Sequence, residues 1–573
     1  MCFVSPIYAI NIDDKREDPF TDIDQYEAIV YLKIGNSVCS GAIIDHRTVL
    51  TAAHCLVEGQ KVQVFTGDRV DEEDPFLETS SFIKLPENKR YPTYNGASYD
   101  LALISLKEPL LDISPLKLSF ELPKLNEKIY ISGFGLHGTG SKPDQDFDKK
   151  KRWGTNILSI IADESVINGE SSETSPDKII LGFYFDKNKN SLESMISLGD
   201  SGSPLIISRN NEFSIVGVAS WIKKNAETFN RGYGSSAGFS STDQNSKWLL
   251  ENNPLRNIST LESGYWNDKT NWNDLDFPSN YIPDEINYNS ISARYYSVNL
   301  GHTIKLNETI FIDALNISET GILFLEENSD LNVLLNTTVS GGNLENDGKL
   351  KSDQLILDGA IFNNRNEAVF SGDAKIKGGQ LNNDGKLIAR EIDINSTEVT
   401  GIGEFISDKF INNGKLNAGT NSQKLGKMNI TAELINLGII EIDISNRNES
   451  DLIYADKLIM GGSLKINPLS KTYSGNSNYT LFNFKKSANK EFIEILLPGT
   501  EFGRLTSNFV YSKNDIKLEL LNPVYETIGI NTQTKKIGKY LDAFSSFTSK
   551  NFQDILNFIN YELDDEKASN YIE

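Results

Sequence analysis

Cysteine, histidine and methionine are scarce in this chain of 573 residues, which holds 3, 4 and 4 of them. No group of Cys and His has the spacing of metal ligands, and no glycine-rich stretch continues into a phosphate-binding loop, so we expect no metal or nucleotide cofactor. Apolar runs of the roughly 18 residues that a membrane-spanning helix requires are also missing. Positive charge is in deficit, because 56 Lys and Arg face 79 Asp and Glu and leave a net charge of −23. Without a basic patch, this balance argues against nucleic acid or an anionic membrane as partner.

The length is too great for one domain and predicts about three units. The opening stretch Met1-Cys2-Phe3-Val4-Ser5-Pro6-Ile7-Tyr8-Ala9 is short and apolar and ends in a small residue before a charged segment. It is typical of the last part of a secretory signal whose basic start is missing, and a disordered tail is the alternative. As a signal it would be cleaved after Ala9, and Cys2 would be lost with it.

The most informative stretch is Gly199-Asp200-Ser201-Gly202-Ser203-Pro204. Two glycines around a serine allow a tight backbone path that can turn successive N–H groups toward one point, as an oxyanion site requires. A plain turn would have a similar composition, so the hexapeptide alone decides nothing.

A serine hydroxyl becomes a useful nucleophile only when a base takes its proton and a third group orients that base. Among the histidines, only His54 has small neighbours that allow close packing around the ring, in Leu50-Thr51-Ala52-Ala53-His54-Cys55. The third group is predicted by Tyr99-Asp100-Leu101-Ala102-Leu103-Ile104-Ser105-Leu106, where a carboxylate enters an apolar strand and must be paired. The remaining histidines are expected to be structural: His46, His137 and His302.

On these three motifs, taken in the order His, Asp, Ser, the first 250 or so residues resemble a chymotrypsin/trypsin-type serine endopeptidase. The resemblance implies two packed β-barrels, with His54, Asp100 and Ser201 meeting in the cleft between them. The alternating apolar strands between Val62 and Leu106 fit this fold, as does an amphipathic helix near Trp248.

The resemblance also implies a disulfide between Cys39 and Cys55, which lie 16 positions apart. Such a bond would stabilise the fold by roughly 3 kcal/mol and would favour an oxidising compartment. Two buried free thiols are the alternative.

Further roles follow from the resemblance position by position. The N–H groups of Gly199 and Ser201 would form the oxyanion hole. Ser220 and Trp221 would pair with the substrate backbone, with Ser220 also close to Asp100.

The same resemblance places three residues on the walls of the specificity pocket. Met195 stands six residues before the nucleophile, where an acidic residue would select Arg or Lys. Ile222 follows Trp221 where the family usually has a glycine, and Ala237 forms the remaining wall. Together they predict a shallow apolar slot and cleavage after small or medium uncharged residues.

Activation is a second departure from the family pattern. In the family, a freed apolar N-terminus pairs with the carboxylate before the nucleophile, here Asp200. Ile10 is the one candidate for that N-terminus, and the alternative is that internal hydrogen bonds hold Asp200.

A weak repeat begins after an irregular connector that contains Trp266 and Trp272. The segment Gly341-Gly342-Asn343-Leu344-Glu345-Asn346-Asp347-Gly348-Lys349-Leu350 recurs 37 positions later as Gly378-Gly379-Gln380-Leu381-Asn382-Asn383-Asp384-Gly385-Lys386-Leu387, and weaker echoes follow at about 18 to 29 residues. Alternating apolar residues that end in Asn-Gly or Asp-Gly corners predict a solenoid of short strands, with stacked Asn ladders between coils. This stretch resembles the passenger stalk of a bacterial autotransporter, a right-handed parallel β-helix, and a series of β-sandwich binding modules is the alternative.

The tail carries apolar residues at helical spacing from Ile537 to Ile559, which predicts amphipathic helices. In the autotransporters that the chain resembles, the segment at this place leads into a translocator barrel. No barrel strands follow here, so we expect either a separately supplied barrel or a truncated chain.

The fold class expected from the sequence is all-β, with a trypsin-like double barrel, a β-helix and a short helical tail. The expected domains are 1–9 signal remnant, 10–252 protease, 253–285 linker, 286–525 β-helix and 526–573 helical tail. Two functions compete: a secreted or surface-displayed endopeptidase acting on protein substrates, and an adhesin-like passenger whose protease domain is inactive or only self-processing.

Overall fold

The structure is a computed structural model. It describes residues 10–16, 26–71, 73–85, 99–163, 179–187, 189, 192–274, 276–281, 293–365, 367–420, 425–487, 491–545, 549–563, 567–568 and 571. The expected signal remnant at residues 1–9 lies outside this part. The chain forms two compact units, the first from Met1–Arg256 and Asn280–Tyr295 and the second from Asn257–Ser279 and Tyr296–Glu573.

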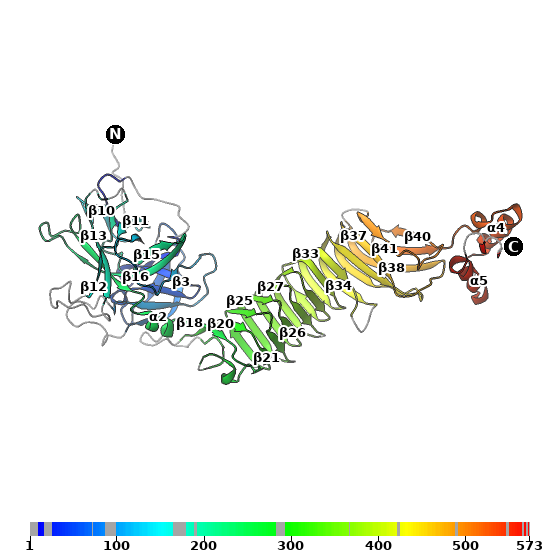
Figure 1. The fold of residues 1–573 in the computed structure, drawn as a ribbon, viewed down its shortest axis with the longest axis horizontal. Coiled ribbons are helices and arrows are strands. Elements are labelled where there is room, and N and C mark those ends of the chain that lie inside the picture. Colours follow the sequence, from blue (N-terminus) through cyan, green and yellow to red (C-terminus); the bar gives the residue numbers. More distant parts are fainter. Residues whose placement is uncertain are drawn as a thin grey trace. The chain divides into compact units, whose positions relative to one another are not determined.

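A closed six-stranded barrel in the order β2-β3-β4-β7-β6-β5 belongs to the first unit (Figure 1). Its strands are β2 (Ile29–Ile34), β3 (Ser37–Asp45), β4 (Thr48–Thr51), β5 (Val62–Phe65), β6 (Leu77–Lys84) and β7 (Ala102–Leu106). Buried apolar side chains such as Leu32, Val64 and Leu103 form its core. Because Thr51 of β4 lies opposite Ala102 of β7, the segment that leaves β4 and the segment that enters β7 meet at one end of the barrel.

The first unit also holds an eight-stranded sheet in the order β11-β9-β15-β16-β17-β13-β12, with β8 paired to β16. Its strands are β8 (Lys117–Leu118), β9 (Lys128–Gly133), β11 (Arg152–Ile157), β12 (Ile160–Asp163), β13 (Ile179–Tyr184), β15 (Pro204–Arg209), β16 (Glu212–Lys223) and β17 (Ser236–Ser241). A small sheet joins β1 (Ile10–Ile12) to β10 (His137–Thr139) and β14 (Ser194–Met195), and the helical segments are η2 (Ala53–Cys55) and α2 (Ser246–Asn252). The trypsin-like β-barrel fold expected from the motifs is confirmed.

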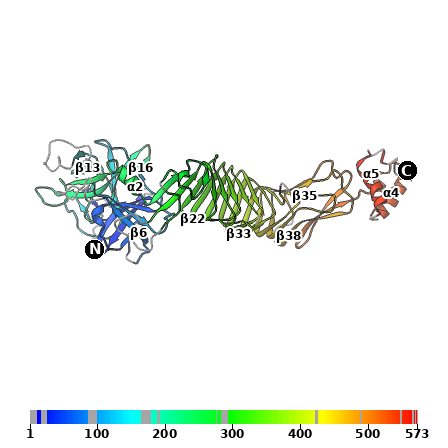
Figure 2. The ribbon, with the colours of Figure 1, turned by 90° about the horizontal axis from the view of Figure 1, so that it is seen from below.

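The second unit is a parallel β-solenoid, in which most strands pair with the strand one coil further along (Figure 2). The sheet runs through β18 (Leu255–Ser259), β19 (Gly264–Tyr265), β20 (Tyr295–Leu300), β21 (Thr303–Leu306), β22 (Thr309–Ile312), β23 (Ala314–Ile317), β24 (Ile322–Leu325), β25 (Asp330–Ser340), β26 (Asn343–Asn346), β27 (Lys349–Asp358), β28 (Ile361–Asn364), β29 (Val369–Lys377), β30 (Gln380–Asn383), β31 (Lys386–Ile388), β32 (Glu391–Thr400), β33 (Glu404–Asn417), β34 (Lys427–Asn436), β35 (Ile439–Ile444), β36 (Leu452–Met460), β37 (Ser463–Pro468), β38 (Ser477–Ser487), β39 (Glu494–Leu496), β40 (Thr506–Tyr511) and β41 (Asp515–Leu521). The last pairings, of β41 with β38 and β40, are antiparallel.

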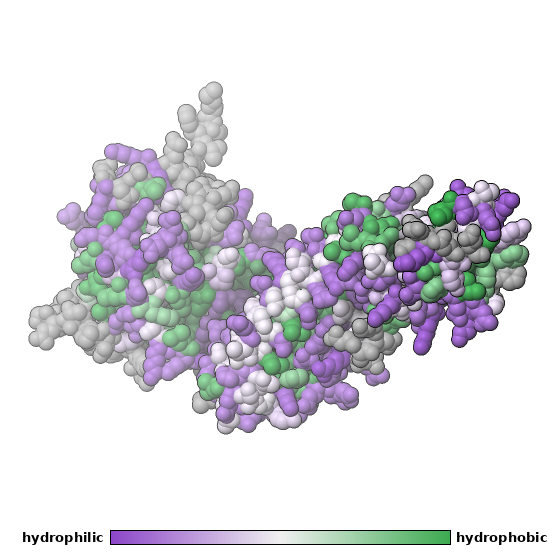
Figure 3. Space-filling view, turned by 45° about the vertical axis from the view of Figure 1, so that its right-hand side comes forward, coloured by the Kyte–Doolittle hydropathy of each residue, from purple (hydrophilic) through white to green (hydrophobic). Residues whose placement is uncertain are grey.

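Alternation of apolar and polar residues explains why this sequence winds into coils. Inward positions stack in register, as Leu344, Phe362 and Leu381 do in successive coils, and polar residues between them face outward. Figure 3 shows hydrophilic residues over much of the solenoid surface.

Buried asparagines stack along the solenoid core, as the repeat predicts. Asn346 Nδ2 donates to Asn364 Oδ1 at 2.7 Å, and Asn364 Nδ2 donates to Asn383 Oδ1 at 2.7 Å, with separations of 18 and 19 residues. All three side chains are fully buried, so each unpaired amide would carry a desolvation penalty. The ladder and the solenoid are therefore confirmed.

The connector tryptophans lie in the solenoid core. Trp266 and Trp272 are almost fully buried and stack edge to face at 5.0 Å between ring centroids. Their indole N–H groups donate to the carbonyls of Pro278 and Trp266. Residues 257–279 thus pack as part of the second unit.

The tail is helical, as its periodicity predicts, with α3 (Tyr525–Ile528), α4 (Thr532–Phe544) and α5 (Lys550–Tyr561). It contacts the last coils, because Arg504 N donates to Asn560 O at 3.2 Å and Tyr473 N donates to Tyr561 Oη at 2.8 Å. Within the described part of the chain, no helix has both the length and the apolarity to cross a membrane.

Candidate active site

His54 and Asp100 meet at the barrel end where β4 finishes and β7 begins. His54 sits in η2, two residues beyond Ala52, and the His54 N–H donates to Asp100 Oδ1 at 2.9 Å. Its ring Nδ1 lies 2.6 Å from Asp100 Oδ2. The carboxylate can only accept, so Nδ1 carries the proton of the neutral ring and Nε2 is left with a lone pair. This is the tautomer that a general base requires.

Asp100 is buried, and its carboxylate accepts hydrogen bonds from His54 and Ser220. Its side chain is 3% exposed, whereas that of His54 is 41% exposed. Ser220 Oγ donates to Asp100 Oδ2 at 2.6 Å, and the Asp100 N–H donates to Ser240 Oγ at 3.1 Å. Ser240 was not singled out by sequence, because one serine in a run of serines carries no distinguishing pattern.

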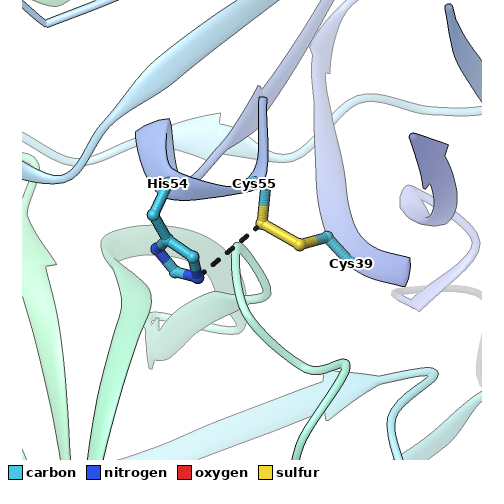
Figure 4. Close-up of side chains that lie close together, drawn as sticks. All are labelled: Cys39, His54 and Cys55. Atoms are coloured by element: carbon cyan, nitrogen blue, oxygen red, sulfur yellow. Dashed lines mark hydrogen bonds between the residues drawn. A yellow bond between two sulfur atoms is a disulfide. The ribbon is translucent and has the colours of Figure 1, made fainter. Parts of the chain in front are cut away.

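The disulfide between Cys39 and Cys55 is present, with an S–S distance of 2.02 Å (Figure 4). This confirms the pairing that the resemblance implies. Cys55 Sγ lies 4.0 Å from His54 Nε2 and 3.6 Å from the carbonyl oxygen of Ser201. Nε2 of His54 and the backbone of Ser201 are therefore both next to the same sulfur.

Ser201 lies between β14 and β15, in a loop that β3 of the closed barrel holds by the hydrogen bond from Ser40 N to Ser201 O at 2.9 Å. Between these described residues, Ser201 Oγ and His54 Nε2 form no hydrogen bond in this structure. Catalytic hydrogen bonds are often long without substrate and shorten in the complex, so this geometry does not exclude proton transfer.

Two N–H groups of the Ser201 loop are unengaged. Among the described residues, the N–H groups of Gly199 and Ser201 donate to no acceptor. The three others nearby do: Asp200 N to Ser197 O, Gly202 N to Ala219 O and Ser203 N to Asp200 O, at 2.9 to 3.1 Å. The loop therefore offers two donors for an oxyanion. A φ of +95° at Gly199, a left-handed conformation that favours glycine, is part of this path.

Asp200 is fully buried behind that loop. Its Oδ1 accepts from Gly135 N at 2.7 Å and its Oδ2 accepts from Ser197 N at 2.8 Å. Burial raises the pKa of Asp200 to about 7, and the hydrogen bonds from Ser197 and Gly135 oppose that rise. The internal hydrogen bonds considered from sequence are thus in place.

Ile10, the candidate for activation, is fully buried in β1. It lies opposite His137 of β10, and the next residue, Asn11, lies opposite Met195 of β14. The φ of Ile10 is +65°, a strained value for a β-branched residue.

The residues predicted to line the pocket lie on β14, β16 and β17. Met195 and Ala237 are fully buried and share an apolar cluster against which Ile222 packs. Ile222 lies opposite Ala237 in the sheet, and Trp221 lies opposite Gly238. A Cβ on Gly238 would come within 2.2 Å of the Trp221 ring, so only glycine leaves room for the indole here.

His137 is a poor candidate for a base. Its ring is buried, and among the described residues neither ring nitrogen has a hydrogen-bond partner. Burial lowers the pKa of His137 to about 3, so the imidazole stays neutral.

Cys39, His54 and Cys55 also bring three potential metal-ligand atoms together. Both sulfurs belong to the disulfide and are not thiolates, so this group does not fit a metal ion.

Comparison with known proteins finds matches for the first part of the chain. Residues 18–242 match the family model described as Trypsin. Mouse kallikrein-8 is 29% identical over 194 residues, which are 32% of this chain and 66% of that protein, and horse kallikrein-1E2 is 26% identical over 229 residues, 38% of this chain and 80% of its own length. Bovine coagulation factor XI is 25% identical over 195 residues, 32% of this chain and 29% of factor XI.

The motif order, the closed barrel and the family match together define a trypsin-family domain over residues 18–242. A β-solenoid follows it in the same chain.

Proposed function

We propose that the chain is a serine endopeptidase that hydrolyses protein substrates through an acyl-enzyme. One observation carries the proposal. Asp100 accepts the hydrogen bond from Nδ1 of His54, and the unprotonated Nε2 of His54 and the Ser201 backbone lie next to the same disulfide sulfur.

The reaction would proceed in two halves. His54 Nε2 accepts the proton of Ser201 Oγ while that oxygen attacks the carbonyl carbon of the scissile peptide bond. The N–H groups of Gly199 and Ser201 stabilise the oxyanion, where one donor is typically worth about 2.7 to 4 kcal/mol. The imidazolium gives its proton to the leaving amine, and water then cleaves the acyl ester with His54 again acting as base.

Asp100 stabilises the imidazolium that forms in each half. Its carboxylate already accepts hydrogen bonds from His54 and Ser220. The disulfide clamps η2 to β3, which keeps the base in place while the proton moves.

The substrate residue before the cleaved bond would be small or medium-sized and uncharged. Met195, Ile222 and Ala237 supply apolar walls, and burial of a charged side chain against them would be costly. A cleavage profile dominated by Arg or Lys would reject this preference.

Secretion or surface display would suit the disulfide, which favours an oxidising compartment. The solenoid would then act as an autotransporter passenger stalk. Neither nucleic acid nor a metal cofactor has a role in this proposal.

Digestion of a peptide library by the purified chain tests the activity, with cleavage sites read by mass spectrometry. We expect cleavage by the wild type and by the matched variant Ser203→Ala, and none by Ser201→Ala. A wild type that cleaves no peptide would favour the alternative, an adhesin-like passenger with an inactive protease domain.

A further inference from the structure

Ser40 on β3 is fully buried and bonded to the Ser201 loop, although nothing in its sequence context marks it. Its N–H donates to Ser201 O at 2.9 Å. Its Oγ lies 3.1 Å from Gly199 O and 3.1 Å from Phe134 N.

The direction of these hydrogen bonds is fixed by their partners. A backbone N–H can only donate and a carbonyl can only accept, so the Ser40 hydroxyl accepts from Phe134 and donates to Gly199. Its single proton is therefore committed to the oxyanion loop.

Three consecutive peptide groups set where the two unengaged N–H groups point. The carbonyl of Leu198 accepts from Leu136 N at 2.7 Å, and this fixes the peptide that carries the Gly199 N–H. The carbonyl of Asp200 accepts from Ser203 N at 2.9 Å, and this fixes the peptide that carries the Ser201 N–H. The peptide between them is held by the Ser40 hydroxyl through Gly199 O and by the bond from Asp200 N to Ser197 O.

Glycine makes the middle peptide the weak point of this path. Gly199 has no Cβ to restrict its dihedrals, so rotation about this residue changes the angle between the N–H groups on either side. A small misplacement of oxyanion donors is expensive for the transition state, because their stabilisation depends on fixed geometry.

We propose that Ser40 is a positioning residue: its hydroxyl fixes the angle between the Gly199 and Ser201 N–H groups. This role rests on the proposed function and deepens it, because the Ser40 hydroxyl sets the geometry of the two oxyanion donors of that same site. Ser40 acts on the substrate only through the loop.

The test compares Ser40→Ala with the wild type in the full chain, on one peptide substrate, with a peptidyl boronate as transition-state analogue. Loss of the hydroxyl should lower kcat about tenfold or more with KM within about twofold, and weaken boronate binding in proportion, because the tetrahedral adduct depends on the oxyanion donors. Ser80→Ala is the matched control, since Ser80 is also a buried barrel serine, bonded to Ser105 Oγ at 2.9 Å. It should lower stability to a similar extent and leave kcat unchanged.

The outcomes separate the two claims. A wild type that neither cleaves the peptide nor binds the boronate contradicts the proposed function. An active wild type with an equally active Ser40→Ala contradicts the positioning role alone, as does a kcat loss that Ser80→Ala reproduces. Ser40→Gly removes the same hydroxyl, and if both Ser40 variants fail to fold, Ser40 is a stability residue and the inference is wrong.

Discussion

The side chain of His54 is nearly half exposed, and Asp100 holds its ring through Nδ1. Sequence motifs could single out His54, Asp100 and Ser201, because their residue types and order are unusual together. They could not single out Ser40 or Ser240, because each acts through a bond to a residue more than 100 positions away, and no local pattern records such a bond.

Asp100→Asn tests the orientation of the base. An amide can donate to Nδ1 and so favours the wrong tautomer, which lowers kcat by about 10⁴-fold in comparable sites. We expect a loss of that order in peptide hydrolysis with a thermal midpoint close to that of the wild type. The exposed Asp112→Asn is the control, and an Asp100→Asn enzyme within tenfold of wild type would contradict this role.

Ile10→Gly tests whether β1 supports the pocket and the activated loop. Ile10 is fully buried next to the strand that carries Met195, and truncating a buried isoleucine to alanine costs about 2 to 5 kcal/mol. Relief of the positive φ recovers only part of that, so we expect reduced kcat/KM on the peptide substrate. Full activity, equal to that of the exposed control Lys15→Gly, would remove Ile10 from activation.

At the level of elements, the solenoid follows from a pattern that sequence shows well. Alternation sets which residues face inward, and the Asn-containing corners repeat often enough to predict the ladder from Asn346 to Asn383. The antiparallel pairing of β41 with β38 and β40 could not be predicted from the sequence. The repeat is no longer recognisable there, and long-range pairing leaves no periodic signal.

We expect Asp451 to make the stability of the solenoid depend on pH. It is fully buried, accepts from Gly426 N and Asp443 N, and burial raises its pKa to about 8. At pH values between about 3.8 and 8, Asp451 is protonated in the folded state and ionised in the unfolded chain. Stability should therefore fall as pH rises between these values, by up to about 1.4 kcal/mol per pH unit.

Urea unfolding at a series of pH values measures this effect, followed by hydrogen exchange in peptides from residues 425–470. Asp451→Asn should remove that part of the pH dependence, and the exposed Asp408→Asn should keep it. Identical pH profiles for Asp451→Asn and the wild type would show that Asp451 does not titrate as described.

At the scale of the whole molecule, the first unit extends beyond the family match. It includes Tyr295, which is fully buried, with its ring 3.9 Å from the guanidinium carbon of Arg47 and its hydroxyl donating to Ser80 Oγ at 3.2 Å. The sequence predicts the protease boundary at residue 252, where the composition changes to that of an irregular connector, and no motif assigns residues 280–295 to the protease.

Tyr295→Ala should therefore destabilise the trypsin-like unit. It removes a buried aromatic ring and a cation–π contact from a buried Arg47, with an expected loss of about 3 kcal/mol or more. Near-ultraviolet circular dichroism in urea would measure the shift. The control is Tyr281→Ala, because Tyr281 is 60% exposed and its loss should change the unfolding midpoint little. Equal midpoints for both variants would contradict this role of Tyr295.

The most direct measurement is reaction of the full chain with a fluorophosphonate, followed by peptide mapping of the adduct. A serine activated by its own base should react at Ser201, lose the label in Ser201→Ala, and react far more slowly in His54→Ala. An unlabelled wild type, a label on another serine, or labelling that does not depend on His54 would contradict the proposal of a serine endopeptidase.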